Sequence, residues 1–160
     1  MIIMLQPPEG VPPLLIGMSI DEARNAMALW GSPEDVFAAP GEAPRLRVRD
    51  EGLTRDIFAH IGDDGKVSAI EVWKPISSKH QGEAVRVLYD DMDIFALPAG
   101  DIIRSLRDRG IVVDESDPFY PNCPRLTLGF NREGGDDIEG ELGVARFFES
   151  VLVARSGYYE

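Results

Sequence analysis

The stretch Gly17-Met-Ser-Ile-Asp-Glu-Ala-Arg-Asn-Ala-Met-Ala-Leu-Trp-Gly-Ser-Pro33 contains the start and stop signals of a short helix. Ser19 and Glu22 have the spacing of a capping box, in which each side chain bonds to the other residue's backbone amide. Gly31 supplies the left-handed residue that ends a helix, and the proline two positions later prevents its continuation. The stretch therefore predicts a helix over 19–30.

This helix carries one apolar stripe for burial against a sheet, formed at helical spacing by Ala23, Ala26, Met27 and Trp30. A second helix is predicted over 98–109, because Pro98 suits a first helical position and Gly110 suits an end. Each helix is followed by segments with the pattern of strands. The order of helix and then strands therefore recurs along the chain, without recurrence of residue identity.

The strands are predicted from alternation and from turn residues. Segments 54–61 and 66–73 flank Gly62-Asp-Asp-Gly65, a strong hairpin signal. Leu46 and Val48 alternate with arginines over 45–49, as in a strand with one solvated face. Further strands are expected at 84–89, 94–97, 111–113, 125–130 and 145–154. Short gaps favour antiparallel pairing, and the predicted fold class is α+β, an antiparallel sheet with two helices packed on one face.

A chain of 160 residues with 44% hydrophobic content fits one domain with a real core, so residues 1–160 are expected to form a single domain. The recurring order of elements suggests two tandem units within it, at 14–74 and 84–154. The polar, irregular segment 75–83 is the expected link between them.

Charge and composition exclude several classes of partner. The 28 acidic and 16 basic residues leave a net charge of −12, which repels nucleic acid and anionic membranes and attracts a basic protein. No apolar run approaches the roughly 20 residues of a membrane span, and no signal peptide is recognised. Cys123, the single cysteine, excludes an internal disulfide. A cytoplasmic location is therefore expected.

The residue types that carry chemistry are scattered. His60 lies in the middle of a predicted strand on the face of Phe58, and we interpret it as a sheet-face residue. His80 lies in the polar link beside Ser77 and Ser78, and Cys123 lies in a loop with no basic cluster nearby. There is no zinc-type Cys or His spacing, no calcium loop and no glycine-rich phosphate loop. Catalytic residues, a metal and a cofactor are therefore not expected.

One motif resembles a known family. Gly17-Met18-Ser19, Glu22-Ala23 and Trp30-Gly31-Ser32-Pro33 are similar to the helix motif of the SmpA/OmlA outer-membrane assembly lipoproteins and of the tandem-repeat β-lactamase inhibitor protein. The resemblance implies a helix packed on an antiparallel sheet, and, for the inhibitor, a duplicated unit that binds protein through an exposed concave face. The segment between the two glycines is about one turn longer here, and the lipidation and disulfide cysteines are missing.

Three functions from different classes are considered. The leading hypothesis is a non-catalytic, acidic protein-binding module of the inhibitor or immunity-protein type, because aromatic side chains anchor interfaces and carboxylates at the rim raise association rates. Its binding residues are expected to be Phe58, His60, Trp73, Tyr89, Asp90, Asp91 and Asp93. One alternative is a small cytoplasmic hydrolase built from His60 or His80 with Cys123. The other is a self-associating structural domain, a homodimer with the Tyr158–Tyr159 segment or a sheet edge at the contact.

Overall fold

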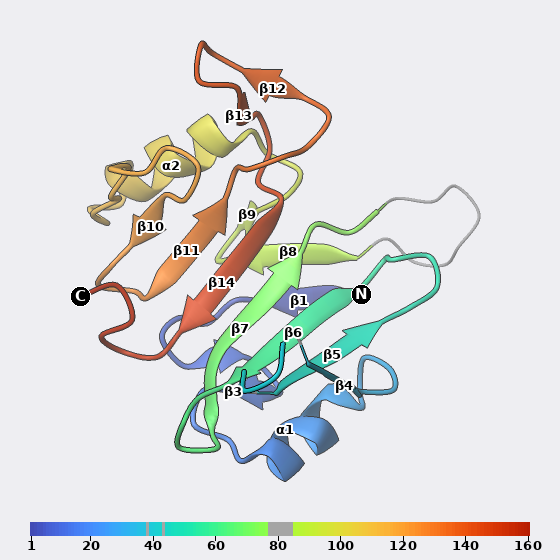
Figure 1. Cartoon of the computed structure of the whole chain (residues 1–160). Coiled ribbons are helices and arrows are strands. Elements are labelled where there is room, and N and C mark those ends of the chain that lie inside the picture. The colour runs from blue at the N-terminus through green and yellow to red at the C-terminus, as the bar shows by residue number, and fades with distance from the viewer. Residues whose placement is uncertain (38, 43, 77–84) are drawn as a thin grey trace.

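The computed structural model describes residues 1–37, 39–42, 44–76 and 85–160. Its largest element is a seven-stranded sheet in the order β10-β11-β14-β7-β6-β5-β4, in which each neighbouring pair is antiparallel (Figure 1). The strands are β4 Glu34–Val36, β5 Arg45–Arg49, β6 Asp56–Ile61, β7 Val67–Trp73, β10 Asn122–Cys123, β11 Leu128–Asn131 and β14 Ser150–Ala154.

Two helices and several short strands complete the fold. The helices are α1 Ile20–Met27 and α2 Ala99–Asp108. A three-stranded sheet has the order β1-β8-β9, with β1 Ile2–Met4, β8 Arg86–Tyr89 and β9 Met92–Asp93, and β1 runs parallel to β8. Two small hairpins are formed by β2 Gly10–Val11 with β3 Leu14–Leu15, and by β12 Ile138–Glu139 with β13 Val144–Ala145. The fold class is α+β, as predicted.

The core lies on one face of the seven-stranded sheet, here called the inner face. Alternate residues of its strands are buried in one hydrophobic cluster: Leu46, Val48, Ile57, Ala59, Ile70, Val72, Leu128, Phe130, Val151 and Val153. Met27 of α1 and Leu106 of α2 belong to the same cluster, so both helices pack on the inner face. The intervening residues point to the opposite side, here called the outer face: Arg45, Arg47, Phe58, His60, Glu71, Trp73, Gly129, Asn131, Ser150 and Leu152.

The capping box of α1 is confirmed. The amide of Glu22 donates to Ser19 Oγ at 3.2 Å, and the amide of Ser19 donates to Glu22 Oε1 at 3.3 Å. The helix ends at Met27, however, one turn before the predicted end at Trp30. The final residues tighten into a turn in which the amide of Trp30 donates to the carbonyl of Met27 at 2.9 Å, and the indole still enters the core.

Gly31 does not form the left-handed cap that was predicted. Its φ of +153° belongs to an extended conformation that glycine alone adopts readily, and a Cβ there would lie 3.0 Å from Val48 Cγ1. Gly31 therefore allows a close approach of the chain to β5. At the end of α2, by contrast, Gly110 has the predicted left-handed conformation, with a φ of +80°.

Several runs predicted as strands form shorter strands or no strand. Residues 94–97 form a turn before α2, residues 111–113 form no strand, and the last strand begins at Ser150 instead of residue 145. Residues 125–127 form a turn, so β11 begins at Leu128. Phe148 shows the reason, because it stacks on Phe130 in the core with 4.3 Å between ring centroids. The hydrophobicity of Phe95, Val113 and Phe148 serves burial in the core instead of sheet pairing.

The two halves of the chain share one sheet. Strand β7, from the first half, pairs with β14, from the second, in the register Trp73–Ser150 to Ala69–Ala154. In each half a short hairpin is followed by a helix and then by antiparallel strands of the large sheet (Figure 1). That order agrees with the tandem-unit hypothesis, which stays a prediction. Most of the predicted link 75–83 lies outside the described residues.

Candidate binding site on the outer face

Three of the predicted binding residues share the outer face. Phe58 and His60 lie on β6, and Trp73 lies on the neighbouring β7. Two arginines of β5 flank Phe58, with Arg45 Cζ at 5.4 Å and Arg47 Cζ at 4.8 Å from the ring centroid. These distances are within the range of cation–π contacts. The alternation of side chains along β6 and β7 was therefore sufficient to predict that Phe58, His60 and Trp73 share a face.

Arg47 is held in place by a second partner. Its Nε and Nη2 donate to the two carboxylate oxygens of Asp56, each at 2.8 Å, and this bidentate bond raises the pKa of Arg47. The same guanidinium therefore lies over an aromatic ring and forms a bidentate hydrogen bond with a carboxylate. The charges of Arg47 and Asp56 are therefore paired with each other.

The other predicted binding residues lie elsewhere. Tyr89, on β8, packs against the core, and the aspartates lie in or beside the β8–β9 turn. Arg109 donates to Asp90 at 3.2 Å and to Asp91 at 2.6 Å, and the latter bond lowers the pKa of Asp91. Asp93 accepts from Arg86 at 3.3 Å. The carboxylates thus pair with arginines of their own chain, and the structure does not bring them to Phe58.

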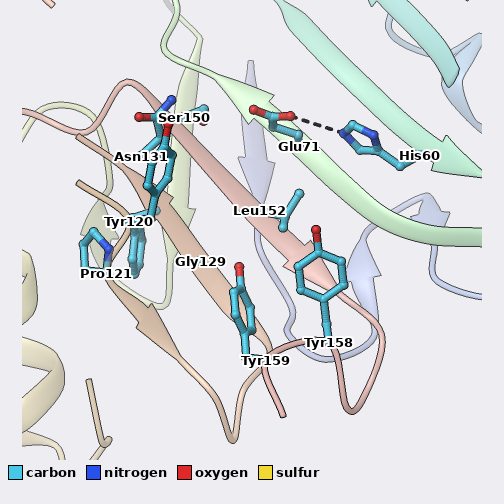
Figure 2. A pocket seen from close by; sticks show the side chains of 11 residues that line it. His60, Glu71, Tyr120, Pro121, Gly129, Asn131, Ser150, Leu152, Tyr158 and Tyr159 are labelled. Atoms are coloured by element: carbon cyan, nitrogen blue, oxygen red, sulfur yellow. Dashed lines mark hydrogen bonds and ion pairs between the residues drawn. The ribbon is translucent and has the colours of Figure 1, made fainter. Parts of the chain in front are cut away.

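A pocket of about 280 Å³ opens on the outer face, and we call it the tyrosine pocket (Figure 2). Its sides are formed by His60, Glu71, Tyr120, Pro121, Tyr158 and Tyr159. Strands β11 and β14 contribute Gly129, Phe130, Asn131, Ser150 and Leu152. Figure 2 shows Tyr120 on one side of these strands, Tyr158 and Tyr159 on another, and Glu71 with His60 on a third.

Tyr159 is positioned by a glycine. The chain turns back after β14, where the amide of Tyr158 donates to the carbonyl of Arg155 at 3.2 Å. The Tyr159 hydroxyl then lies over Gly129, so close that a Cβ at that position would be only 1.7 Å from it. Burial raises the pKa of Tyr159, and its hydroxyl therefore stays protonated. Tyr158 contacts Tyr159 edge to face, with 5.0 Å between centroids.

Tyr120 is positioned by a loop with its own side-chain bonds. Asp117 Oδ1 accepts from the amide of Phe119 at 3.0 Å, and the carbonyl of Asp117 accepts from the amide of Tyr120 at 3.1 Å. The Tyr120 hydroxyl donates to Glu133, and this bond, with burial and the charge of Glu133, raises the pKa of Tyr120. The ring is 46% exposed, so one face of it remains available to a ligand.

The polar end of the pocket is the pair of His60 and Glu71. His60 Nε2 lies 3.2 Å from Glu71 Oε2, and both side chains are partly exposed. The pair spans neighbouring strands, because Glu71 is opposite Phe58 and His60 is two residues further along β6.

The structure does not bring together the His60 version of the predicted hydrolase site. Cys123 is fully buried on the inner face, so its thiol lies on the opposite side of the sheet from His60. Burial also raises the pKa of this thiol to about 11. Ser150 lines the pocket, but the register places it four residues along and two strands across from His60. At roughly 3.4 Å per residue and 4.8 Å per strand, that separation is about 17 Å. His80 lies outside the described residues.

A second hollow of about 700 Å³ adjoins Trp73 on the outer face. Phe147 lies in it, with Lys74 Nζ at 5.2 Å and Arg146 Cζ at 5.5 Å from its ring centroid. Ile76 at its margin is 54% exposed. The outer face therefore combines two hollows with aromatic and cationic side chains between and beside them.

Comparison with known protein families, with curated proteins and with solved structures finds no match to this chain. Among the described residues, no group of three or more His, Cys, Asp or Glu side chains is placed to hold a metal ion. Neither α1 nor α2, the helices of the described ranges, has the length and apolar character needed to cross a bilayer.

Sequence reasoning missed most of the tyrosine pocket. Glu71 has the same parity as Trp73 along β7, so its place on the outer face was open to prediction. Tyr120 and Tyr159 lie in turns, where no periodicity indicates direction, and the importance of Gly129 depends on a tyrosine 30 positions later. Only the tertiary structure brings these residues together.

Proposed function

We propose that this protein is a non-catalytic protein-binding module and that the outer face of its large sheet is the binding surface. The observation that carries the proposal is the gathering of large aromatic side chains on the side of the sheet opposite both helices: Phe58, Trp73, Tyr120, Tyr158. All four are partly or largely exposed to solvent. Aromatic residues and arginine are enriched among the side chains that dominate binding energy at interfaces.

A face with hollows and exposed aromatic side chains suits a protein partner better than a flat polar surface would. The hollows beside Trp73 and between the tyrosines can receive anchor side chains, while Arg45 and Arg47 present guanidinium groups beside Phe58. The resemblance of the first helix to that of the tandem β-lactamase inhibitor protein supports the same mode, binding through an exposed sheet face. The net charge of −12 favours a basic partner.

The test is partner capture by the full chain with substitutions that leave the core untouched. Tyr120→Asp and Tyr158→Asp together place two charges on the outer face at exposed positions, 46% and 51% accessible. Leu29→Asp makes the same kind of change just after α1, at a side chain that is 72% exposed. Each protein is used at low salt to capture binding proteins from its native cell extract.

We expect the double outer-face variant to lose the captured protein and Leu29→Asp to keep it. Matching unfolding midpoints for all three proteins ensure that the loss is one of surface and not of fold. Capture that is equally strong for both variants would show that the outer face is not the binding surface. No captured protein at low salt, even with the unmodified chain, would count against a binding function.

A further inference from the structure

The tyrosine pocket has an aromatic side and an acidic side. Figure 2 shows the rings of Tyr158 and Tyr159 across Leu152 from the carboxylate of Glu71. The pocket of about 280 Å³ is large enough for one long side chain. Aromatic faces and a carboxylate around one small space attract cations, since the ring faces are electron-rich.

The charges around the pocket favour a cation in the same way. None of the described side chains that line it is a lysine or an arginine, and Glu71 is its acidic residue. Glu133, Asp117 and Glu71 all act on the Tyr120 hydroxyl and help to raise the pKa of Tyr120. Negative potential therefore extends from the β7 side of the pocket to the Tyr120 side.

The outer face already contains a model for how a guanidinium would bind. Arg47 stacks on Phe58 at 4.8 Å and forks the carboxylate of Asp56 with two bonds of 2.8 Å. The tyrosine pocket offers the same two partners, ring and carboxylate, without an arginine of its own. A planar, weakly hydrated guanidinium can stack and donate at once, whereas an ammonium is a strongly hydrated point charge.

We propose that the tyrosine pocket binds an arginine side chain of a basic protein partner, with Glu71 as the acceptor and the tyrosine rings as the stacking surface. This inference rests on the proposed protein-binding function and names the residue type that the partner inserts. The pocket and the net charge of −12 are complementary to such a partner. His60 Nε2 lies 3.2 Å from Glu71 Oε2 at the same end of the pocket.

The experiment uses a free probe, so that it does not depend on the partner. Nα-acetyl-arginine methylamide is titrated into the full chain, and the backbone amide signals of Gly129, Leu152 and Glu71 are followed by NMR. The citrulline derivative has nearly the same shape without the charge, and the lysine derivative has the charge without the plane. We expect millimolar binding of the arginine probe, about tenfold weaker binding of citrulline, and weaker binding of lysine.

Variants of the pocket separate the two partners of the guanidinium. Glu71→Gln removes the charge and keeps the shape, and we expect it to weaken arginine binding about tenfold and to abolish the preference over citrulline. Tyr158→Leu removes an aromatic face at a side chain that is 51% exposed, and we expect a loss of about threefold or more. Glu141→Gln removes the same charge from the β12–β13 hairpin and should leave binding unchanged.

Equal binding of arginine and citrulline, shifts located outside the pocket, or undiminished binding by a folded Glu71→Gln protein would each overturn the inference. These results would leave the protein-binding function standing if the double outer-face variant still fails to capture its partner. Conversely, arginine binding in the pocket together with partner capture that ignores both outer-face substitutions would leave an arginine-binding pocket but would show that the partner does not use it, and would overturn the outer face as the binding surface. Unfolding midpoints of Glu71→Gln and Tyr158→Leu check that both remain folded.

Discussion

Replacement of Gly129 by alanine is expected to expel Tyr159 from its place on the sheet. The new Cβ would lie 1.7 Å from the Tyr159 hydroxyl oxygen and 2.8 Å from Cζ. Non-bonded carbon and oxygen atoms stay more than about 3 Å apart, so the hydroxyl must move by more than about 1.3 Å. Because backbone lies beneath it and the turn after β14 fixes its Cα, the ring has to swing outward into solvent.

The expected loss of stability follows from the area of that ring. A tyrosine buries about 200 Å² at most, and Tyr159 is half-buried, so roughly 100 Å² is returned to water. At about 25 cal/mol per Å² this is about 2.5 kcal/mol, or about 2 kcal/mol once a compact unfolded chain is allowed for. Alanine restricts the unfolded chain and recovers about 0.5–1 kcal/mol. We expect a net loss of about 1–1.5 kcal/mol.

Urea unfolding of four proteins measures this contact as a double-mutant cycle. The set is the unmodified chain, Gly129→Ala, Tyr159→Ala and the double variant. With the Tyr159 ring absent, the alanine Cβ at position 129 has no other atom closer than 3.6 Å, so the substitution should be neutral or stabilising by up to about 1 kcal/mol. If Gly129→Ala has the same effect in both backgrounds, or costs nothing in the first, Tyr159 is not held over Gly129.

Three further predictions concern the helix cap, the hairpin and the thiol. Ser19→Ala should lower the free energy of unfolding by about 1 kcal/mol, and Ser19→Thr by much less; equal losses in urea unfolding would contradict the capping role. Arg132 is buried and donates to the carbonyl of Ala145 at 2.8 Å and to Glu139 at 2.9 Å. Arg132→Lys should therefore lower the free energy of unfolding by about 1–2 kcal/mol. Glu139→Gln, at the exposed end of the contact, should lower it by less than about 1 kcal/mol. At pH 8, Cys123 should be labelled at least about a hundredfold more slowly than in the urea-unfolded chain, because burial raises its pKa from 9.0 to about 11. The folded rate should go on rising to about pH 11, whereas the unfolded rate levels off above about pH 9.

The parts of the fold that were predictable from sequence depend on local signals. The β6–β7 hairpin follows from alternation around an Asp and Gly turn, and the start of α1 follows from two side chains three positions apart. The end of α2 follows from one glycine with a positive φ. In each case the residues that decide the conformation are neighbours in the chain, so no tertiary contact is needed to recognise them.

The rest depends on packing, which short patterns do not record. Ile94, Phe95 and Phe148 are apolar because they fill the core, and the same hydrophobicity is typical of a strand. Gly31 was interpreted as a helix cap, but its extended conformation and missing Cβ allow the chain to approach Val48 on β5. The parallel pairing of β1 with β8 joins proline-rich and distant segments without any local sign.

In the candidate site, too, some residues were predictable from local patterns and others were not. Phe58, His60 and Trp73 share a face because strand parity is visible in the sequence. Tyr89 is also aromatic but lies on the three-stranded sheet, and no local pattern distinguishes it from the aromatic residues of the outer face. The tyrosines of the pocket come from turns, whose side-chain directions are set by bonds such as the one from Tyr120 to Glu133.

The central pair of strands β7 and β14 makes folding of this chain a non-local event. Trp73 and Ser150 are opposite each other although 77 positions separate them, whereas β6 and β7 close through a short turn. Loop-closure entropy therefore favours early formation of the hairpin and late arrival of β14. Until then β7 is an open strand edge that can pair with another chain. The yield of refolding should accordingly fall as protein concentration rises, even for variants whose native stability is unchanged.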